Sequence, residues 1–143
     1  MPGDFDAITD LLQTYFDGLY LSDVDRLARV FHPRARYVTA SGEDLVDLSM
    51  AEYFAIVAAR PSPASRRELR QDRIVAIAFA GPRTAFARVN CAIGERAFTD
   101  FLTLVRDAGA WRIIAKVFHY DIISPGPAAS TARAKAEMSD ALR

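Results

Sequence analysis

The sequence of 143 residues has little cysteine, no net charge and no long apolar run. Cys91 is the only cysteine, so the chain cannot form an internal disulfide, and we expect an inert buried thiol there. Basic and acidic residues number 18 each, a balance that gives no electrostatic footprint for nucleic acid or an anionic membrane. No apolar stretch reaches the roughly 18 residues that a membrane helix needs.

Several sequence motifs are also missing. The two histidines and one cysteine have no spacing typical of a zinc site, so we expect neither a metal nor another cofactor. The glycine-rich loops that bind nucleotides and the G-x-S-x-G turn that carries a nucleophilic serine are both absent. The acidic start lacks the basic and apolar segments of a secretory signal, which favours a cytoplasmic protein.

The length and composition predict one domain followed by a tail. Hydrophobic residues make up 51% of the chain, which is enough for a sizeable core. We assign residues 1–123 to this domain. Residues 124–143 open with Ser-Pro-Gly-Pro and become rich in alanine and arginine, so we expect a flexible C-terminal tail.

The first half of the chain has helical patterning. Apolar residues recur at helical spacing over residues 5–20. A second helix is predicted from Ser22 until Pro33 stops it, because proline disfavours helical geometry in the residue before it. Ser49 and Glu52 have the spacing of a capping box, which predicts a third helix ending near Arg60.

The second half has the patterning of strands. Residues 67–80, 84–93, 96–106 and 110–123 are rich in β-branched and aromatic residues and are separated by short glycine-containing turns, which predicts an antiparallel meander. A shorter extended segment is expected at 35–40. Helices first and strands later indicate an α+β fold, with three helices packed on a curved antiparallel sheet.

The short turns also predict which residues share a face of the sheet. Pairing Arg106 with Trp111 across the last turn places Asp100 opposite Val117 and diagonal to His119 on one largely apolar face. We assign this face to the concave side under the helices. The opposite face would carry Lys116 among arginine, threonine and aromatic residues, a mixture that suits an interface between two copies.

Three segments carry a family resemblance: residues 31–35 (Phe-His-Pro-Arg-Ala), 98–104 (Phe-Thr-Asp-Phe-Leu-Thr-Leu) and 109–119 (Gly-Ala-Trp-Arg-Ile-Ile-Ala-Lys-Val-Phe-His). In this order the chain resembles the nuclear transport factor 2-like superfamily and its lumazine-binding subgroup, close to polyketide-cyclase-like members. The resemblance implies a cystatin-like cone, a dimer and an apolar cavity. In catalytic relatives such as ketosteroid isomerase and scytalone dehydratase, Asp, His and Tyr in the cavity perform acid–base chemistry.

The candidate site residues each have two interpretations. Asp100 and His119 are either a catalytic acid–base pair or a buried pair that holds two strands in register. His32 either caps a helix C-terminus or faces the pocket. The remaining candidates either line a ligand site or are core residues; they are Tyr15, Tyr37, Tyr53, Phe98 and Trp111.

We therefore predict a dimeric pocket protein that binds a small apolar or aromatic ligand. One alternative is an isomerase, dehydratase or cyclase that uses Asp100 and His119. Another is a protein-interaction module whose pocket is vestigial.

Overall fold

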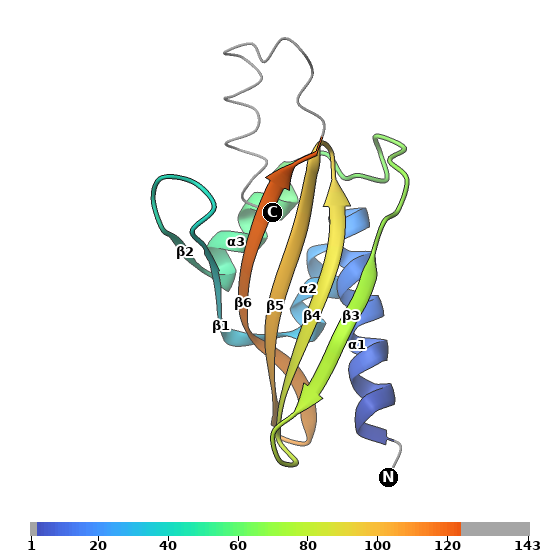
Figure 1. Cartoon of the computed structure of the whole chain (residues 1–143), viewed down its shortest axis with the longest axis vertical. Helices are drawn as coiled ribbons and strands as arrows, with labels where there is room; N and C mark the ends of the chain where they lie inside the picture. The colour runs from blue at the N-terminus through green and yellow to red at the C-terminus, as the bar shows by residue number, and fades with distance from the viewer. Residues whose placement is uncertain (1–2, 124–143) are drawn as a thin grey trace.

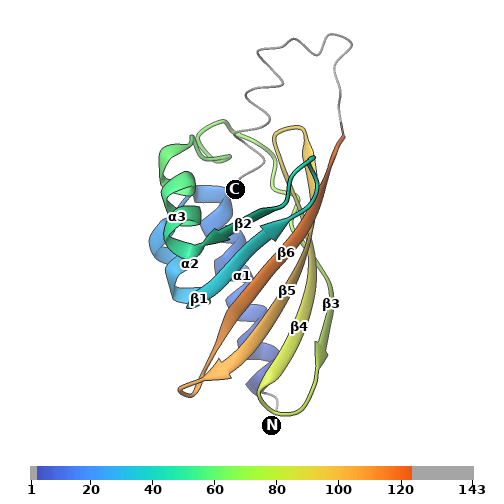
Figure 2. The same cartoon turned by 90° about the vertical axis from the view of Figure 1, so that its left-hand side faces the viewer.

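The computed structural model describes residues 3–123, so the predicted tail at 124–143 lies outside the described residues. Three helices pack against one face of a six-stranded sheet, as Figures 1 and 2 show from two sides. The elements follow in the order α1 (Gly3–Leu21), α2 (Val24–Val30), β1 (Phe31–Thr39), β2 (Val46–Ser49), α3 (Met50–Ala59), β3 (Arg73–Phe79), β4 (Thr84–Ile93), β5 (Arg96–Asp107) and β6 (Ala110–Ile122).

The predicted helices are present, with shifts at their ends. Asp23 caps α2 in place of Ser22, and its side chain accepts a hydrogen bond from the Arg26 backbone N–H. Phe31 already has extended geometry, so α2 ends earlier than Pro33 requires. The capping box at α3 is confirmed: the Ser49 hydroxyl accepts from the Glu52 backbone, and Glu52 accepts from the Ser49 backbone. This last bond lowers the pKa of Glu52.

Helices α1 and α2 lie close together at a glycine. A Cβ atom at Gly18 of α1 would lie 2.7 Å from the Leu27 Cδ2 atom of α2. Such a separation is too short for two carbon atoms, so a larger residue at position 18 would require the Leu27 side chain or the helices to shift. The apolar faces of both helices can therefore bury together on the sheet.

The sheet is mixed, which corrects the prediction of a purely antiparallel sheet. Its strand order is β2-β1-β6-β5-β4-β3. Strands β3 to β6 form the predicted antiparallel meander, but β1 pairs with β6 in parallel. The chain reaches β1 before the meander begins, and no short turn joins β1 to β6, so the turns could not reveal this pairing. The short strand β2 was not predicted.

One extra residue in β6 changes the face of every residue after it. Leu104 pairs with Ile113 as predicted, but Thr103 pairs with Ala115, which leaves Ile114 as a β-bulge. Strand side chains alternate between faces, so a shift of one residue exchanges inside and outside. Beyond the bulge, Lys116 is buried and His119 is exposed, the reverse of the predicted assignment.

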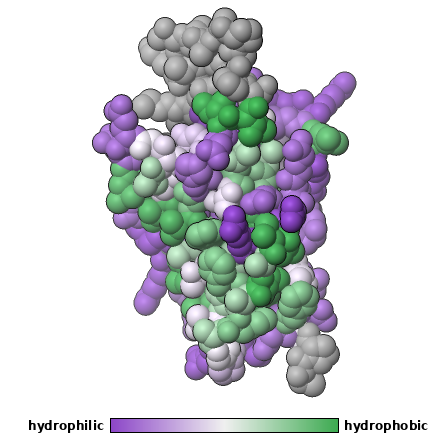
Figure 3. Space-filling view, in the orientation of Figure 1, coloured by the Kyte–Doolittle hydropathy of each residue, from purple (hydrophilic) through white to green (hydrophobic). Residues whose placement is uncertain are grey.

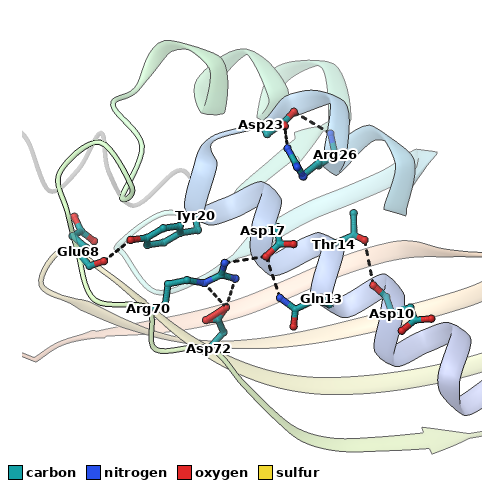
Figure 4. Close-up of polar contacts among 10 residues, drawn as sticks. All are labelled: Asp10, Gln13, Thr14, Asp17, Tyr20, Asp23, Arg26, Glu68, Arg70 and Asp72. Atoms are coloured by element: carbon teal, nitrogen blue, oxygen red, sulfur yellow. Dashed lines mark hydrogen bonds and ion pairs between the residues drawn. The ribbon is translucent and has the colours of Figure 1, made fainter.

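The loop between α3 and β3 is fixed to α1 by polar contacts (Figure 4). The Tyr20 hydroxyl donates to the Glu68 carbonyl at 2.7 Å. Arg70 forms ion pairs with Asp17 at 2.9 Å and with Asp72 at 2.7 Å, and the hydrogen bond to Asp72 is the main cause of the raised pKa of Arg70. Residues 67–72, predicted as part of a strand, therefore belong to an anchored loop.

Candidate functional site

Two charged side chains lie in the interior, between the sheet and the helices. Asp100 on β5 and Lys116 on β6 are both fully buried, and the Lys116 Nζ atom lies 4.0 Å from Asp100 Oδ2. Burying either charge alone would cost roughly several kcal/mol, so a buried pair needs further groups that compensate for the lost water. The partners come from both helices and strands.

Phenol groups supply the hydrogen bonds. Tyr15 on α1 donates from its hydroxyl to Asp100 Oδ2 at 2.6 Å. Lys116 donates from Nζ to the Tyr53 hydroxyl, on α3, at 3.4 Å. Residues distant in sequence therefore meet at one point because helices and sheet fold over each other.

Aromatic faces surround the lysine amine. The Nζ atom of Lys116 lies 5.0 Å from the ring centre of Tyr15, 5.2 Å from that of Tyr53 and 5.6 Å from that of Tyr37. The ring of Phe118 is at 5.4 Å. These distances are within the range of cation–π attraction, which stabilises an ammonium group that water cannot reach.

The stacked pair Tyr37 and Tyr53 forms one wall. Their ring centres are 4.6 Å apart and their planes differ by 26°. We call the five interior residues the Lys116 cluster; they are Tyr15, Tyr37, Tyr53, Asp100 and Lys116. Every one has a fully buried side chain, so the cluster combines an amine, a carboxylate and three phenols with no exposure to solvent. Such a group can bind a polar edge of a ligand or move a proton.

The predicted Asp100–His119 pairing is wrong because of the bulge at Ile114. Asp100 lies opposite Val89 and faces inward as predicted. The side chain of His119 is 62% exposed on the opposite face, where its Nε2 atom lies 2.9 Å from Asp121 and its Nδ1 atom 3.4 Å from the Ser41 hydroxyl. Lys116, assigned to the outer face from the sequence, occupies the interior position near Asp100.

His32 lies in β1 rather than at a helix end. Its Nε2 atom bonds Asp107 in the β5–β6 hairpin at 2.9 Å, and its Nδ1 atom accepts from the Arg34 backbone N–H at 3.0 Å. The bond to His32 lowers the pKa of Asp107. His32 is therefore not brought together with the Lys116 cluster. These contacts support neither the predicted cap at a helix C-terminus nor the predicted position in the pocket.

The two other predicted aromatic residues, Phe98 and Trp111, are not members of the cluster. Phe98 is buried and its ring contacts those of Phe118 and Tyr120 at centroid distances of 6.0 and 5.7 Å. Trp111 is buried near the start of α1, where its indole N–H donates to Asp4 at 3.3 Å. Phe98 contacts the ring of Phe118, which in turn contacts Tyr37 of the cluster, whereas Trp111 lies at the other end of the sheet.

The hollows on the surface lie away from the cluster. One, of about 510 Å³, is formed by the N-terminal part of α1 and the β5–β6 hairpin around Trp111. Another, of about 420 Å³, lies at the junction of α1 and α2, and a third, of about 20 Å³, lies beside Cys91. None of these three hollows is lined by Asp100 or Lys116.

The described residues contain neither a metal-binding cluster nor a membrane-spanning helix. Within residues 3–123, no group of three or more His, Cys, Asp or Glu side chains is arranged to hold a metal ion. No helix in the part of the chain that the structure describes is long and apolar enough to cross a membrane.

Comparison with known proteins identifies the family. Residues 3–119 match the family described as "Putative lumazine-binding". The chain belongs to this lumazine-binding family. No curated protein sequence matches the chain.

The fold of this lumazine-binding family member is similar to that of solved proteins described as NTF2-like, including one with a cystatin-like fold. An NTF2-like protein of unknown function from Shewanella baltica is 24% identical with a TM-score of 0.72, covering 86% of this chain and 95% of that chain. One from Silicibacter pomeroyi is also 24% identical, with a TM-score of 0.69 and coverage of 82% and 95%. A ketosteroid isomerase-like protein from Erwinia carotovora atroseptica is 12% identical, with a TM-score of 0.67 and coverage of 87% and 100%.

Proposed function

We propose that this protein binds a small planar aromatic ligand against the Lys116 cluster. The observation that carries the proposal is the fully buried pair of Lys116 and Asp100, held by phenols beneath the helices. Buried ionisable groups are costly to a fold, and they gather at functional sites more often than in ordinary cores. The family description, lumazine binding, supports the same class of ligand.

The chemistry of the cluster fits a heteroaromatic ring with polar edges. Lys116 can donate a hydrogen bond to a carbonyl oxygen or ring nitrogen, and Asp100 can accept one from a ring N–H. The stacked rings of Tyr37 and Tyr53 offer flat apolar surfaces of the kind that a planar ligand contacts. A ligand of this kind would satisfy the same buried polar atoms that the phenols now satisfy.

Binding requires a movement of side chains. Since the whole cluster is buried, a ligand reaches Lys116 only when a ring such as that of Tyr37 or Tyr53 turns away. Opening the stack exposes two aromatic faces, and a planar guest inserted between them would restore the lost contacts. We therefore expect slow association compared with an open site.

Fluorescence polarisation of lumazine, which is itself fluorescent, tests the proposal. We expect saturable binding to the wild type and at least about tenfold weaker binding to Asp100→Asn, corresponding to about 1.4 kcal/mol. Lys116→Arg should also bind more weakly, because the larger planar guanidinium cannot occupy the same space. His119→Gln is the matched control, since it alters the outer face of the same strand and should bind as the wild type does. Absence of wild-type binding, or equal binding by all four proteins, would refute the proposal.

Acid–base catalysis is the second candidate function. It is favoured by the 2.6 Å bond between Tyr15 and Asp100, which joins a carboxylate to a phenol inside an apolar shell. In this version of the predicted isomerase, dehydratase or cyclase, Lys116 and Tyr15 replace His119 as partners of Asp100. The tests are Asp100→Asn and Tyr15→Phe: both should lower kcat for a substrate that the wild type turns over, while His119→Gln should not.

We also propose that two copies associate through the outer face of the sheet. Arg88, Phe101 and Val117 are paired in one row across β4, β5 and β6, and Phe101 and Val117 are each nearly half exposed. Figure 3 shows apolar surface over this face of the sheet, interrupted by hydrophilic residues. Sedimentation should give a dimer at micromolar concentration, and Val117→Glu should give a monomer. A wild-type monomer would refute this assembly.

The cytoplasmic location expected from the sequence stays a prediction.

A further inference from the structure

Lysine is rare in this chain, and its use is selective. Of the 18 basic residues that are lysine or arginine, only two are lysines, Lys116 and Lys135. Lys116 is the one lysine in the range 3–123 and is also fully buried. Every other cation in that range is an arginine or a histidine. The position that faces Asp100 in the interior therefore differs chemically from the other basic positions of the described fold.

The difference between the two side chains is one of reactivity as well as shape. Arginine keeps its charge in proteins and is not a nucleophile, whereas the primary amine of lysine can lose a proton and attack a carbonyl carbon. Lysines that form imines are typically desolvated in apolar pockets. Lys116 meets this condition, because aromatic rings on several sides exclude water from its Nζ atom.

The groups that imine formation needs lie next to the amine. Asp100, at 4.0 Å from Nζ, is a proton acceptor, and Tyr15 holds one of its oxygens in place at 2.6 Å. The Tyr53 hydroxyl, at 3.4 Å from Nζ, is positioned to donate a proton to an oxygen bonded near the amine. A carboxylate and a phenol beside a buried amine are the acid and base of such a reaction.

We propose that Lys116 forms an imine with a small aromatic aldehyde or ketone. The inference rests on the proposed function, because the ligand must reach the Lys116 cluster. It narrows the ligand class from planar aromatic compounds to those that carry a reactive carbonyl. The aromatic rings around Lys116 would pack against the ring of such a compound, and the amine would bond to its carbonyl carbon.

The reaction balances without a cofactor. The Lys116 ammonium first gives a proton to Asp100, and the neutral amine attacks the carbonyl carbon, forming a C–N bond as the C=O electron pair moves to oxygen. The oxygen takes one proton from the Tyr53 phenol, and the nitrogen loses one to the phenolate. The hydroxyl then leaves as water with the proton held by Asp100, while the nitrogen lone pair forms the C=N bond. The products are one protonated imine, whose nitrogen keeps the third ammonium proton, and one water, and Asp100 is again a carboxylate beside the positive charge.

Reductive trapping tests the inference. The full chain is incubated with benzaldehyde and sodium cyanoborohydride, and the adduct is located by peptide mapping in a mass spectrometer. We expect the adduct on Lys116 to form before any on Lys135 or the N-terminal amine, and to be lost in Lys116→Arg. Lys135→Arg is the matched control and should keep the Lys116 adduct.

Asp100→Asn gives an independent readout, because it keeps the amine but removes the proposed base. The rate of trapping at Lys116 should fall by about 100-fold, the lower range for loss of acid–base assistance. Circular dichroism shows whether each variant is folded. If a variant is unfolded, wild-type mapping still decides, because native protein should label Lys116 first and urea-unfolded protein should label both lysines alike.

The outcomes separate this inference from the proposed function. Lumazine binding to the wild type without a Lys116 adduct would overturn the imine and leave the binding site standing. An adduct on Lys116 that lumazine blocks would support both. Neither binding nor an adduct would overturn both, and Lys116 would then be part of a structural ion pair only.

Discussion

Charged side chains on the inner and outer faces of β6 differ in their burial and in the groups that stabilise them. Lys116 and His119 are three positions apart, yet the first is fully buried and the second is 62% exposed at its side chain. Lys116 is surrounded by groups from α1, β1, α3 and β5, whereas the ion-pair partner of His119, Asp121, is two residues away on the same strand. A buried charge requires partners that the whole fold supplies, while an exposed charge is stabilised by water and near neighbours.

Deletion of Ile114 should break this comparison with the largest effect. Removing the bulge would turn Lys116 and Phe118 outward and turn Val117 and His119 toward the helices. The expected loss is most of the stability of the domain, about 5–15 kcal/mol, seen as the disappearance of a cooperative urea transition. Ile114→Ala keeps the extra residue and should retain the transition. A deletion variant that unfolds like the wild type would show that the bulge does not set the faces.

Lys116→Met should have the next largest effect. Replacing the amine by an apolar side chain of similar length leaves the Asp100 carboxylate buried without its cation, which should cost about 3–5 kcal/mol in urea unfolding. Adding Asp100→Asn should recover part of this loss, so the double variant is more stable than the sum of the single effects predicts. His119→Gln should change stability by less than about 0.5 kcal/mol. Additive effects at Lys116 and Asp100 would contradict the pairing.

The exposed pair of His32 and Asp107 should give the smallest effect, visible as a pH dependence. The hydrogen bond to His32 lowers the folded pKa of Asp107 below its usual 3.8, so the unfolded chain binds the proton more readily. The pair therefore stabilises the fold above pH 3.8, and this contribution disappears as the pH falls through the lowered value. Wild type and Asp107→Asn should become closer in stability over that range. In a His32→Gln background the pH-dependent difference should vanish, and its persistence would assign the shift to another group.

Much of the architecture could be predicted from local patterns. The apolar spacing of residues 5–20, the capping box at Ser49 and Glu52, and the short turns after residues 93 and 107 each depend on chemistry within a few residues. The pairing across the last turn also placed Asp100 on the inner face, where it is buried opposite Val89 of β4. The parallel pairing of β1 with β6 could not be predicted, because no short connection links the two strands.

Local sequence patterns identified Asp100 and the three tyrosines of the site as candidates. They did not identify Lys116, because they gave the wrong faces to the residues of β6 after the bulge. An alternating strand with one bulge has the same composition as one without it, so residues 110–122 alone gave His119 the inner face and Lys116 the outer one. The bulge lies where β6 pairs with both β1 and β5. In each of these two pairings the register shifts between Ile113 and Ala115. Only contacts with both neighbouring strands place it at Ile114.

The sequence by itself thus determined the α+β class, through helix spacing and turn chemistry, and the family, which matches over residues 3–119. The tertiary structure alone decided which cation faces Asp100. Because side chains alternate between the two faces of a strand, a shift of one residue exchanges the inner and outer positions. Burying a charge costs roughly several kcal/mol, so the inner position requires a cation that the phenols, the aromatic rings and the carboxylate can stabilise together. That selection turned a predicted aspartate–histidine pair into the Lys116 cluster.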